Sequence, residues 1–369
     1  MKFYGKYLYL RLKYKIGIGD YFEHSLYDDK SHEEYYSSLH FVIHKWKNVK
    51  KTFEPNKSKI WELIHYCDYL ISKIVCPGLD AMDYYRYEFY NLSWNKRKTF
   101  ITEGEVIKLN NYFNGKKECK ILLNKFKNKD EFNTIFSDYI KRKWIKTINI
   151  QEKDILNFCD KLEKVIIKPL DGGGGKGIQI IDVRTKYQIQ SLYSKISGKN
   201  YLLEEVIEQH QVLSELNPFS VNTIRVYSIS INDEIKITGA TLRIGRNKEP
   251  VDNYSRGGFA AEIDIESGIV VSRAVTQFGE SVYIHPLTKK NIIGINIPNW
   301  EIIKKEVKKA HSLVKSVGYI GWDVVVSKNE EVLFLEANTC AGVELQQHPG
   351  LNGKKNMYFN YINKKWRLM

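Results

Sequence analysis

A run of four consecutive glycines at residues 172–175 constrains the fold of this chain more than any other feature of its sequence. Each glycine inside a strand or helix costs about 0.5–1 kcal/mol relative to alanine, so the run is predicted to form a loop. Residues 165–167 favour a buried strand that ends at Lys168. Because Lys168 and Lys176 flank the run, its backbone N–H groups suit a closely bound anion. A flexible hinge or a wide turn is the alternative.

The size and composition indicate an ordinary globular protein. A chain of 369 residues is long enough for two or three domains, and 43% hydrophobic and 27% charged residues exclude a disordered chain. The odd number of cysteines includes no CxxC pair and no spacing typical of metal ligands, which predicts a reduced, cytoplasmic protein. These cysteines are Cys67, Cys76, Cys119, Cys159 and Cys340.

The first twenty residues are apolar but are interrupted by lysine and arginine. They contain no uninterrupted apolar core of signal-peptide length and nothing near the roughly 20 residues that a membrane span needs. We therefore expect neither export by this route nor a transmembrane segment.

The net charge of +14 is spread over the first half of the chain, with basic runs between residues 94 and 147. A solvated basic face explains this charge, and so does attraction to an anionic partner such as a nucleotide, an acidic sugar, a lipid-linked phosphate or a membrane surface. No zinc-finger spacing, RNP-type strand or helix-turn-helix signal is present, so we expect no nucleic-acid partner. Peripheral membrane association and the oligomeric state stay open.

The periodicity predicts helices in the first 95 residues and strands in the second half. Residues 31–46 and 60–75 favour helices, and the second places Ile60, Ile64, Cys67 and Ile71 at helical spacing. The aromatic-rich residues 83–94 are predicted to form core or a domain contact rather than a ligand platform. Further predicted elements are strands at 165–169, 177–183 and 201–207, a hairpin of 221–231 and 235–245 that turns at Asn232 and Asp233, and a helix over 299–317.

Two acidic residues and an amide are predicted to share one surface. Asp323 lies on an apolar strand, and a turn through residues 328–331 would bring it beside Glu336 and Asn338 on the antiparallel partner strand. Glu336 and Asn338 are two residues apart, so both side chains face the same side of a sheet. Their oxygens are hard ligands that suit Mg²⁺ bridging phosphates. The alternative is that both acids are ordinary solvent-facing strand residues.

Arg225 and Arg243 alternate with apolar neighbours on the two strands of the predicted hairpin. A buried arginine is costly unless it is paired, so each is expected to hold an anion or to form a structural salt bridge. Asn222, Asn253 and Arg256 are further candidate substrate contacts.

These motifs resemble the ATP-grasp superfamily, through Lys168 before the glycine loop, the strand at 202–207 and the ending from Asp323 to Glu336 and Asn338. The chain is most similar to the sugar-transfer-associated ATP-grasp proteins, which are encoded among polysaccharide genes, through residues 208–226 and 243–258. The resemblance covers about residues 120–350. It implies an α+β fold in which two subdomains clamp ATP, preceded by a mostly helical, basic N-terminal portion.

The resemblance also implies a division into domains. It assigns a helical N-terminal region to residues 1–98, a small basic segment to 99–160, a subdomain with the glycine-rich lid loop to 161–210, and a C-terminal subdomain with the metal site to 211–369.

The resemblance further implies roles for individual residues. Lysines would contact the ATP phosphates, the glycine loop would close over them as a lid, residues 204–207 would present backbone groups to adenine, and one of Glu208, Gln209 and His210 would reach the ribose. The implied ATP-binding residues are Lys125, Lys168, Gly172, Gly173, Gly174, Gly175, Lys176, Gly177, Glu204, Glu205, Val206, Ile207, Glu208 and His210. Asp323, Glu336 and Asn338 would hold one or two Mg²⁺ ions.

The sequence departs from the family pattern at one position. Some ATP-grasp ligases carry an arginine two residues before the metal-binding aspartate, where it steadies an acyl phosphate, but this chain has Gly321 there. Arg225 and Arg243 are the alternative sources of that catalytic charge.

The resemblance implies an ATP-dependent carboxylate–amine ligase that forms an amide through an acyl phosphate and releases ADP. The substrates expected from the subgroup are an amino acid and a sugar or sugar nucleotide of a surface polysaccharide, such as capsule or O-antigen. Two alternatives are phosphotransfer to a hydroxyl at the same ATP site, and a nucleotide-binding scaffold of polysaccharide assembly without turnover.

Overall fold

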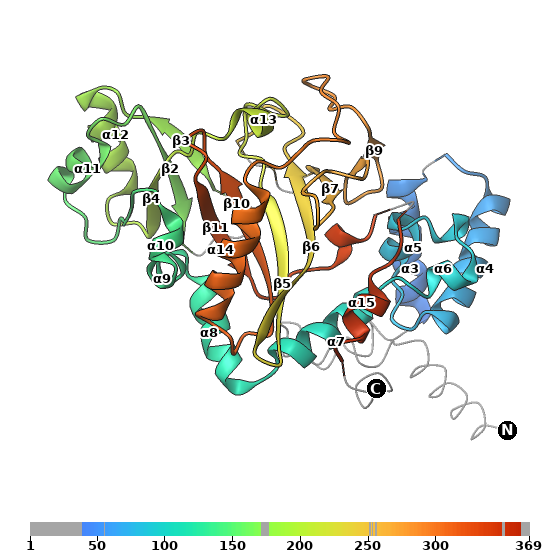
Figure 1. Ribbon diagram of the computed structural model, residues 1–369. Helices are drawn as coiled ribbons and strands as arrows, with labels where there is room; N and C mark the ends of the chain where they lie inside the picture. The colour runs from blue at the N-terminus through green and yellow to red at the C-terminus, as the bar shows by residue number, and fades with distance from the viewer. Residues whose placement is uncertain are drawn as a thin grey trace. The chain divides into compact units, whose positions relative to one another are not determined.

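The computed structural model describes residues 39–54, 56–170, 177–250, 252, 254, 257–348 and 351–362. The chain divides into two compact units. One contains Met1–Tyr112, Phe278–Glu280 and Gly342–Met369, and the other contains Phe113–Gln277 and Ser281–Ala341. The predicted α+β class with a helical N-terminal region is confirmed (Figure 1). None of the described helices is both long and apolar enough to cross a lipid bilayer.

The first unit is helical in its described part. Its elements are α3 (Leu39–Phe53), α4 (Lys59–Val75), α5 (Ala81–Arg86), η1 (Phe89–Asn91), α6 (Trp94–Arg97), most of α7 (Glu103–Asn114), η3 (Glu344–Gln346) and α15 (Lys355–Phe359). The helix predicted over 60–75 is α4, and the predicted helix start at Ser31 lies outside the described residues. Trp46 stacks on Tyr69 at the centre of an aromatic core. Tyr84, Tyr85, Tyr87 and Phe89 are buried there, so the predicted core role holds for these residues of the stretch, whereas Trp94 is exposed.

The second unit begins with α8 (Lys117–Lys127), α9 (Lys129–Ile135) and α10 (Ser137–Ile140), and then forms a small antiparallel sheet. Among the described residues the strand order of this sheet is β1-β4-β2-β3, from β1 (Trp144–Lys146), β2 (Lys164–Pro169), β3 (Gln179–Asp182) and β4 (Tyr201–Glu205). Helices α11 (Glu152–Cys159) and α12 (Lys186–Ile196) bury apolar residues against it. The strands predicted on both sides of the glycine loop are β2 and β3.

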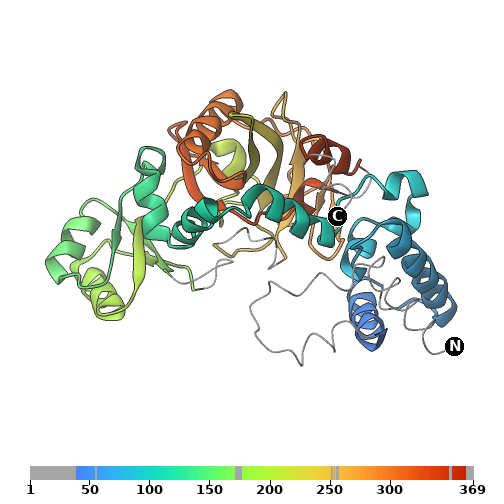
Figure 2. The same cartoon turned by 90° about the horizontal axis from the view of Figure 1, so that it is seen from below.

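A larger antiparallel sheet follows, whose described strands have the order β11-β10-β5-β6-β7-β8-β9. They are β5 (Ile224–Ile231), β6 (Glu234–Ile244), β7 (Phe259–Ile263), β8 (Ala274–Val275), β9 (Ser281–Val282), β10 (Tyr319–Val326) and β11 (Val332–Asn338). The short α13 (Gln211–Ser214) precedes β5. Helix α14 (Trp300–Ser312) lies against this sheet in both views (Figures 1 and 2). It is the helix predicted over 299–317.

Strand alternation separates the two faces of the large sheet. Ile224, Val226, Trp322 and Val324 pack with α14 in the main core, while the residues between them project from the opposite face. The tight turn between β5 and β6 consists of Asn232 and Asp233, both with positive φ (49° and 61°), as a two-residue turn of this type requires. Both predicted hairpins are therefore present, and together they set the register of the candidate site.

Asn114, the last residue of α7, fixes the strand ends that lead into the site. Its amide nitrogen donates to the carbonyl oxygens of Tyr319 (2.8 Å) and Thr339 (2.6 Å). Its amide oxygen accepts from the N–H groups of Gly318 and Tyr319, both at 2.9 Å. The buried side chain thus satisfies backbone groups at the start of β10 and just after β11.

We predict that Asn114→Ala lowers the free energy of unfolding by about 3 kcal/mol, because it leaves several buried backbone groups without partners. Urea denaturation measures this change. The matched control is Asn111→Ala, at an exposed position of the same helix, which we expect to change stability by less than about 0.5 kcal/mol. Equal effects of the two changes would contradict the role assigned to Asn114.

Candidate active site

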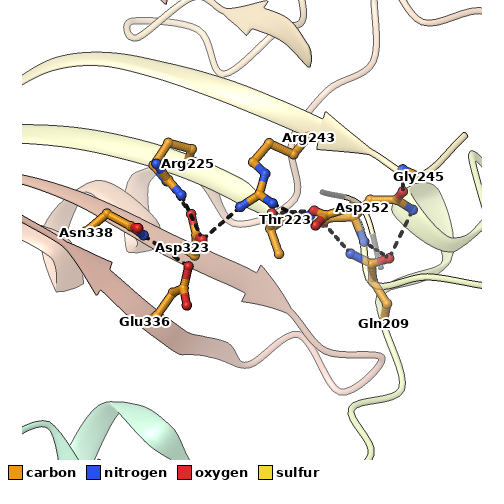
Figure 3. Close-up of polar contacts among 10 residues, drawn as sticks. Gln209, Thr223, Arg225, Arg243, Gly245, Asp252, Asp323, Glu336 and Asn338 are labelled. Atoms are coloured by element: carbon orange, nitrogen blue, oxygen red, sulfur yellow. Dashed lines mark hydrogen bonds and ion pairs between the residues drawn. The ribbon is translucent and has the colours of Figure 1, made fainter. Parts of the chain in front are cut away.

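A row of polar side chains crosses the large sheet on the face opposite α14. Antiparallel pairing places Arg225 of β5 directly beside Asp323 of β10, and Asp323 directly beside Glu336 of β11. Arg243 of β6 lies two residues beyond Thr241, the partner of Arg225. Figure 3 shows these side chains pointing toward one another from four neighbouring strands. The predicted pairing of Asp323 with Glu336 is thus observed in the register of the hairpin.

Buried ion pairs join this row. The guanidinium of Arg225 binds both carboxylate oxygens of Asp323, through Nε and, at 2.9 Å, through Nη2. Arg243 donates from Nη1 to Asp323 (2.8 Å) and from Nη2 to Asp252 (3.1 Å). Asp252 is held in turn by the backbone N–H of Thr223 at 2.8 Å. Of the two alternatives left by the sequence, the structure shows salt bridges at both arginines.

The two carboxylates of the hairpin differ in protonation chemistry. Burial alone would raise the pKa of Asp323, but Arg225 and Arg243 outweigh it and hold that pKa below its ordinary value. Desolvation by the surrounding chain and the negative charge of Asp323 both raise the pKa of Glu336. Because Glu336 is exposed to solvent, the charge of Asp323 is the more direct cause. Arg225 and Arg243 therefore hold Asp323 as an anion, whereas ionisation of Glu336 is opposed by the neighbouring carboxylate.

The donor set of this corner fits a divalent cation. No group of three His, Cys, Asp or Glu residues in the described part of the chain is placed to hold a metal, so carboxylates alone do not make a site at this corner. Asn338 supplies an amide oxygen, and its Nδ2 donates to Glu336 Oε1 at 3.1 Å, which brings the two side chains together. Three carboxylates face two guanidiniums in the row, and a cation would neutralise the excess on Glu336.

Gly321 explains how Arg225 reaches Asp323. A Cβ atom at position 321 would lie 2.6 Å from the Cβ of Ala341 and 3.1 Å from the Cδ of Arg225. The side chain of Arg225 therefore lies in the space that a side chain at position 321 would otherwise need. The positive charge beside Asp323 comes from Arg225 on the neighbouring strand β5.

A second buried ion cluster surrounds Lys168. Its ammonium pairs with the carboxylate of Glu204, which Arg142 also binds at 2.8 Å. Arg142 donates further to the carbonyl oxygen of Phe334 on β11, also at 2.8 Å. The two cations hold the pKa of Glu204 below its ordinary value despite complete burial. This cluster ties the small sheet to the strand that carries Glu336.

The chain after β4 lies beside the β10–β11 turn. Glu208 pairs with Lys328 at 2.6 Å and accepts the Lys328 backbone N–H at 2.8 Å. A cavity of about 120 Å³ opens here between residues 205–208, the turn at 327–331 and Leu333. Glu205, Val206 and Ile207, predicted to present backbone groups to adenine, line this cavity.

Three further predicted residues have structural partners. Gln209 accepts from the backbone N–H of Asn222 at 3.0 Å, and His210 Nδ1 accepts from the N–H of Val212 at 3.2 Å to begin α13. Asn222 is fully buried, donates to the carbonyl oxygens of Leu213 and Asn217, and accepts from Gly245 N–H. These bonds use its amide inside the protein, so this structure does not favour Asn222 as a substrate contact.

The remaining predicted residues lie near the glycine loop or outside the described residues. Gly177 has φ of 76°, and a Cβ there would lie 2.7 Å from Pro169, so glycine is required. Lys125 is exposed on α8, while Lys129 donates to the carbonyl oxygens of Pro169 and Leu170 before the loop. The positions outside the described residues are Gly172, Gly173, Gly174, Gly175, Lys176, Asn253 and Arg256.

Sequence reasoning missed the partners of the predicted residues. Asp252 lies in an irregular segment, and Arg142 and Lys129 lie in basic runs that resemble a solvated surface. One signal was available for Arg142: Glu204 falls within an apolar strand, and a buried carboxylate requires a cation.

The chain was compared with known proteins. A family model described as "Sugar-transfer associated ATP-grasp" matches residues 107–358. No curated protein matches the sequence.

Three solved structures with a similar arrangement have low sequence identity to this chain. An ADP complex of the N5-carboxyaminoimidazole ribonucleotide synthetase purK is 11% identical (TM-score 0.39; 60% of this chain, 47% of that chain). The D-alanine–D-alanine ligase from Coxiella burnetii is 12% identical, with a TM-score of 0.36 over 64% of this chain and 52% of that chain. The ATP-grasp ligase PsnB with minimal precursor, Mg and ADP is 13% identical, with a TM-score of 0.40 over 75% of this chain and 70% of that chain. The chain thus spans about half the length of the first two.

We predict that Asp323→Asn lowers the free energy of unfolding by about 3–5 kcal/mol, because it leaves Arg225 and Arg243 buried beside a neutral amide. Chemical denaturation measures the loss. Asp233→Asn, at an exposed turn position of the same sheet, is the matched control and should change little. A small effect of Asp323→Asn would contradict the buried charge cluster.

In the protein without ligand, we predict that Glu336→Gln does not lower the free energy of unfolding. A carboxyl group whose pKa is raised on folding opposes folding once it ionises, so its contribution falls as pH rises through that pKa. The variant should therefore melt at the same temperature as the wild type or higher, with a difference that grows as pH rises. Thermal unfolding from about pH 5 to about pH 8 tests this, and a lower melting temperature at high pH would refute it.

Proposed function

Since the chain belongs to the sugar-transfer associated ATP-grasp family, we propose that it is an ATP-dependent carboxylate–amine ligase. Its proposed product is an amide between an amino acid and a sugar of a surface polysaccharide, formed in the cytoplasm, where ATP is available. The observation that carries this proposal is the row Arg225–Asp323–Glu336 on one face of the large sheet. Family membership supports the ATP site, and the acceptor rests on the family description.

The proposed nucleotide site follows the edge of the small sheet. Residues 205–207 would present backbone groups to adenine beside the cavity near Leu333. Lys168, whose ammonium Glu204 holds in place, would meet the phosphates as they approach the glycine loop. A lysine already positioned by a buried carboxylate loses little conformational entropy when an anion binds.

The metal site is proposed on Asp323, Glu336 and Asn338. Mg²⁺ held there would neutralise phosphate charge and orient the transferred group. Asp323 stays ionised through its two arginines, Glu336 keeps access to solvent, and Asn338 steadies Glu336.

Arg243 provides direct support for a bound anion. Its Nε is buried and has no hydrogen-bond partner within the described residues. An unsatisfied buried donor costs about 1–3 kcal/mol, and an anion over the row would satisfy it. We propose that Arg243, with the N–H groups of Arg225 that Asp323 leaves open, stabilises charge on the reacting carboxylate or phosphate.

The proposed reaction has two steps. A carboxylate oxygen attacks the γ-phosphorus of ATP, the bond to the bridging oxygen breaks, and ADP leaves. The amine then attacks the carbonyl carbon of the acyl phosphate, phosphate leaves, and the nitrogen loses a proton to give the amide. Within this chain, the arginines would balance the negative charge that develops.

We predict that Glu336→Gln abolishes ATP turnover while the protein stays folded, because one carboxylate ligand is lost. Glu330→Gln, an exposed glutamate in the turn of the same hairpin, is the control and should keep full turnover. Release of phosphate and the melting temperature are measured for both. Turnover retained in Glu336→Gln would contradict the metal assignment.

The substrates are tested by incubating the protein with Mg-ATP and pooled amino acids, with and without uronic acids and amino-sugar nucleotides. ADP formed only with one carboxylate and amine pair is the expected result. Hydroxylamine should trap the activated carboxyl group as a hydroxamate. ADP without a hydroxamate would favour phosphotransfer to a hydroxyl, and AMP would overturn the acyl-phosphate mechanism.

A further inference from the structure

Helix α4 of the helical unit has an outward face made of apolar residues alone. Between Ile60 and Ile74, every exposed residue of the helix is apolar. They are Ile60 (74% exposed), Leu63 (63%), Ile64 (60%), Cys67, Ile71 (50%) and Ile74 (55%). The inward face, with Tyr69 and Ser72, is buried in the aromatic core. Figure 1 shows α3, α5 and α6 on one side of α4 within this unit.

This arrangement reverses the usual orientation of an amphipathic helix. A surface helix ordinarily turns its apolar stripe to the core and its polar side chains to water. In α4 the regular isoleucine stripe faces away from the core. A contiguous exposed apolar patch of this kind marks an interaction site.

The order of residues along the stripe is symmetric about Cys67. Isoleucines lie seven residues before and seven after it, at positions 60 and 74. Leu63 and Ile71 lie four residues before and four residues after it, and both are exposed. At three residues the symmetry is incomplete, because the counterpart of the exposed Ile64 is Leu70, which is partly buried against the aromatic core. The spacing through residues 60, 64, 67, 71 and 74 alternates four and three, the seam of an antiparallel or parallel helix pair.

We propose that α4 pairs antiparallel with α4 of a second copy of this chain, about a twofold axis beside Cys67. A twofold interface must be complementary to itself, and a palindromic stripe satisfies that condition. Ile60 would lie against the partner's Ile74, and Leu63 against the partner's Ile71. A lipid surface or an unrelated helix requires no such symmetry.

Charge at the ends of the helix agrees with the antiparallel direction. The exposed Lys59 begins α4. In the antiparallel pair it lies beside the last turn of the partner helix, whose carbonyl groups carry partial negative charge. The lysine of that turn, Lys73, is buried on the inward face and donates to the Leu79 carbonyl oxygen, so its ammonium does not face Lys59. A parallel pair would instead bring the two Lys59 side chains together.

The oligomeric state tests this pairing. Light scattering across a concentration series should show a dimer of the full chain, and Ile64→Glu with Ile71→Glu should weaken dimerisation at least tenfold. Leu313→Glu, equally exposed at the end of α14, is the matched control and should remain dimeric. Circular dichroism confirms folding, and Ile74→Lys alone gives a milder variant with a smaller loss. A dimer that persists in the double variant overturns the proposal.

Crosslinking tests the position of the axis. In a Cys340→Ser background, Cys67 is the exposed cysteine that remains, and a short bis-maleimide should link two copies through it. Cys67→Ser should abolish the link. A dimer without this crosslink overturns the antiparallel register. A protein that is monomeric at every concentration overturns the pairing. If that monomer sediments with anionic vesicles and Ile64→Glu abolishes the sedimentation, the apolar face is assigned to a lipid surface.

Discussion

The pairing of Asp323 with Arg225 and Arg243 is the interaction on which the candidate site depends. Three charged groups are buried on one face of a sheet, and each would be unstable there without the others. Strands β5, β6 and β10 must therefore keep the register that brings them together. A shift of one residue would turn Asp323 into the apolar core beneath α14. The same register places Glu336 beside Asp323. Because both arginines already bind Asp323, the carboxyl group of Glu336 remains available for a ligand.

A second cluster extends this constraint to the small sheet. Arg142 contacts both Glu204 of β4 and the backbone of Phe334 on β11. Lys168 is therefore positioned through the same strand that carries Glu336. Phosphoryl transfer depends mainly on positioning and charge neutralisation, so two ion clusters joined by one strand suit that chemistry. The structure thus uses buried charge to hold the proposed phosphate-binding and metal-binding groups on one body.

Helical periodicity shows why a pattern alone does not give orientation. The spacing of Ile60, Ile64, Cys67 and Ile71 predicted α4 correctly, because local periodicity follows from helix geometry. The aromatic side chains of α3 and α5 fill the core on the other side of α4, and the aliphatic stripe is left outside. Aromatic rings bury more area per residue than isoleucine, which favours this choice. Only the packing of the whole unit reveals a face that suits a second copy.

The sequence by itself determined the α+β class, the two hairpins, α14 and the pairing of Asp323 with Glu336, because each depends on local spacing and turn chemistry. It also indicated that Arg225 and Arg243 needed partners, because a buried cation is costly. Which partners they have was decided by tertiary structure alone. Arg225 and Asp323 lie 98 residues apart in the chain, and no local pattern encodes that contact. The pairing of distant strands fixes which charges meet, and this places the carboxylates and the arginines on one face of the large sheet.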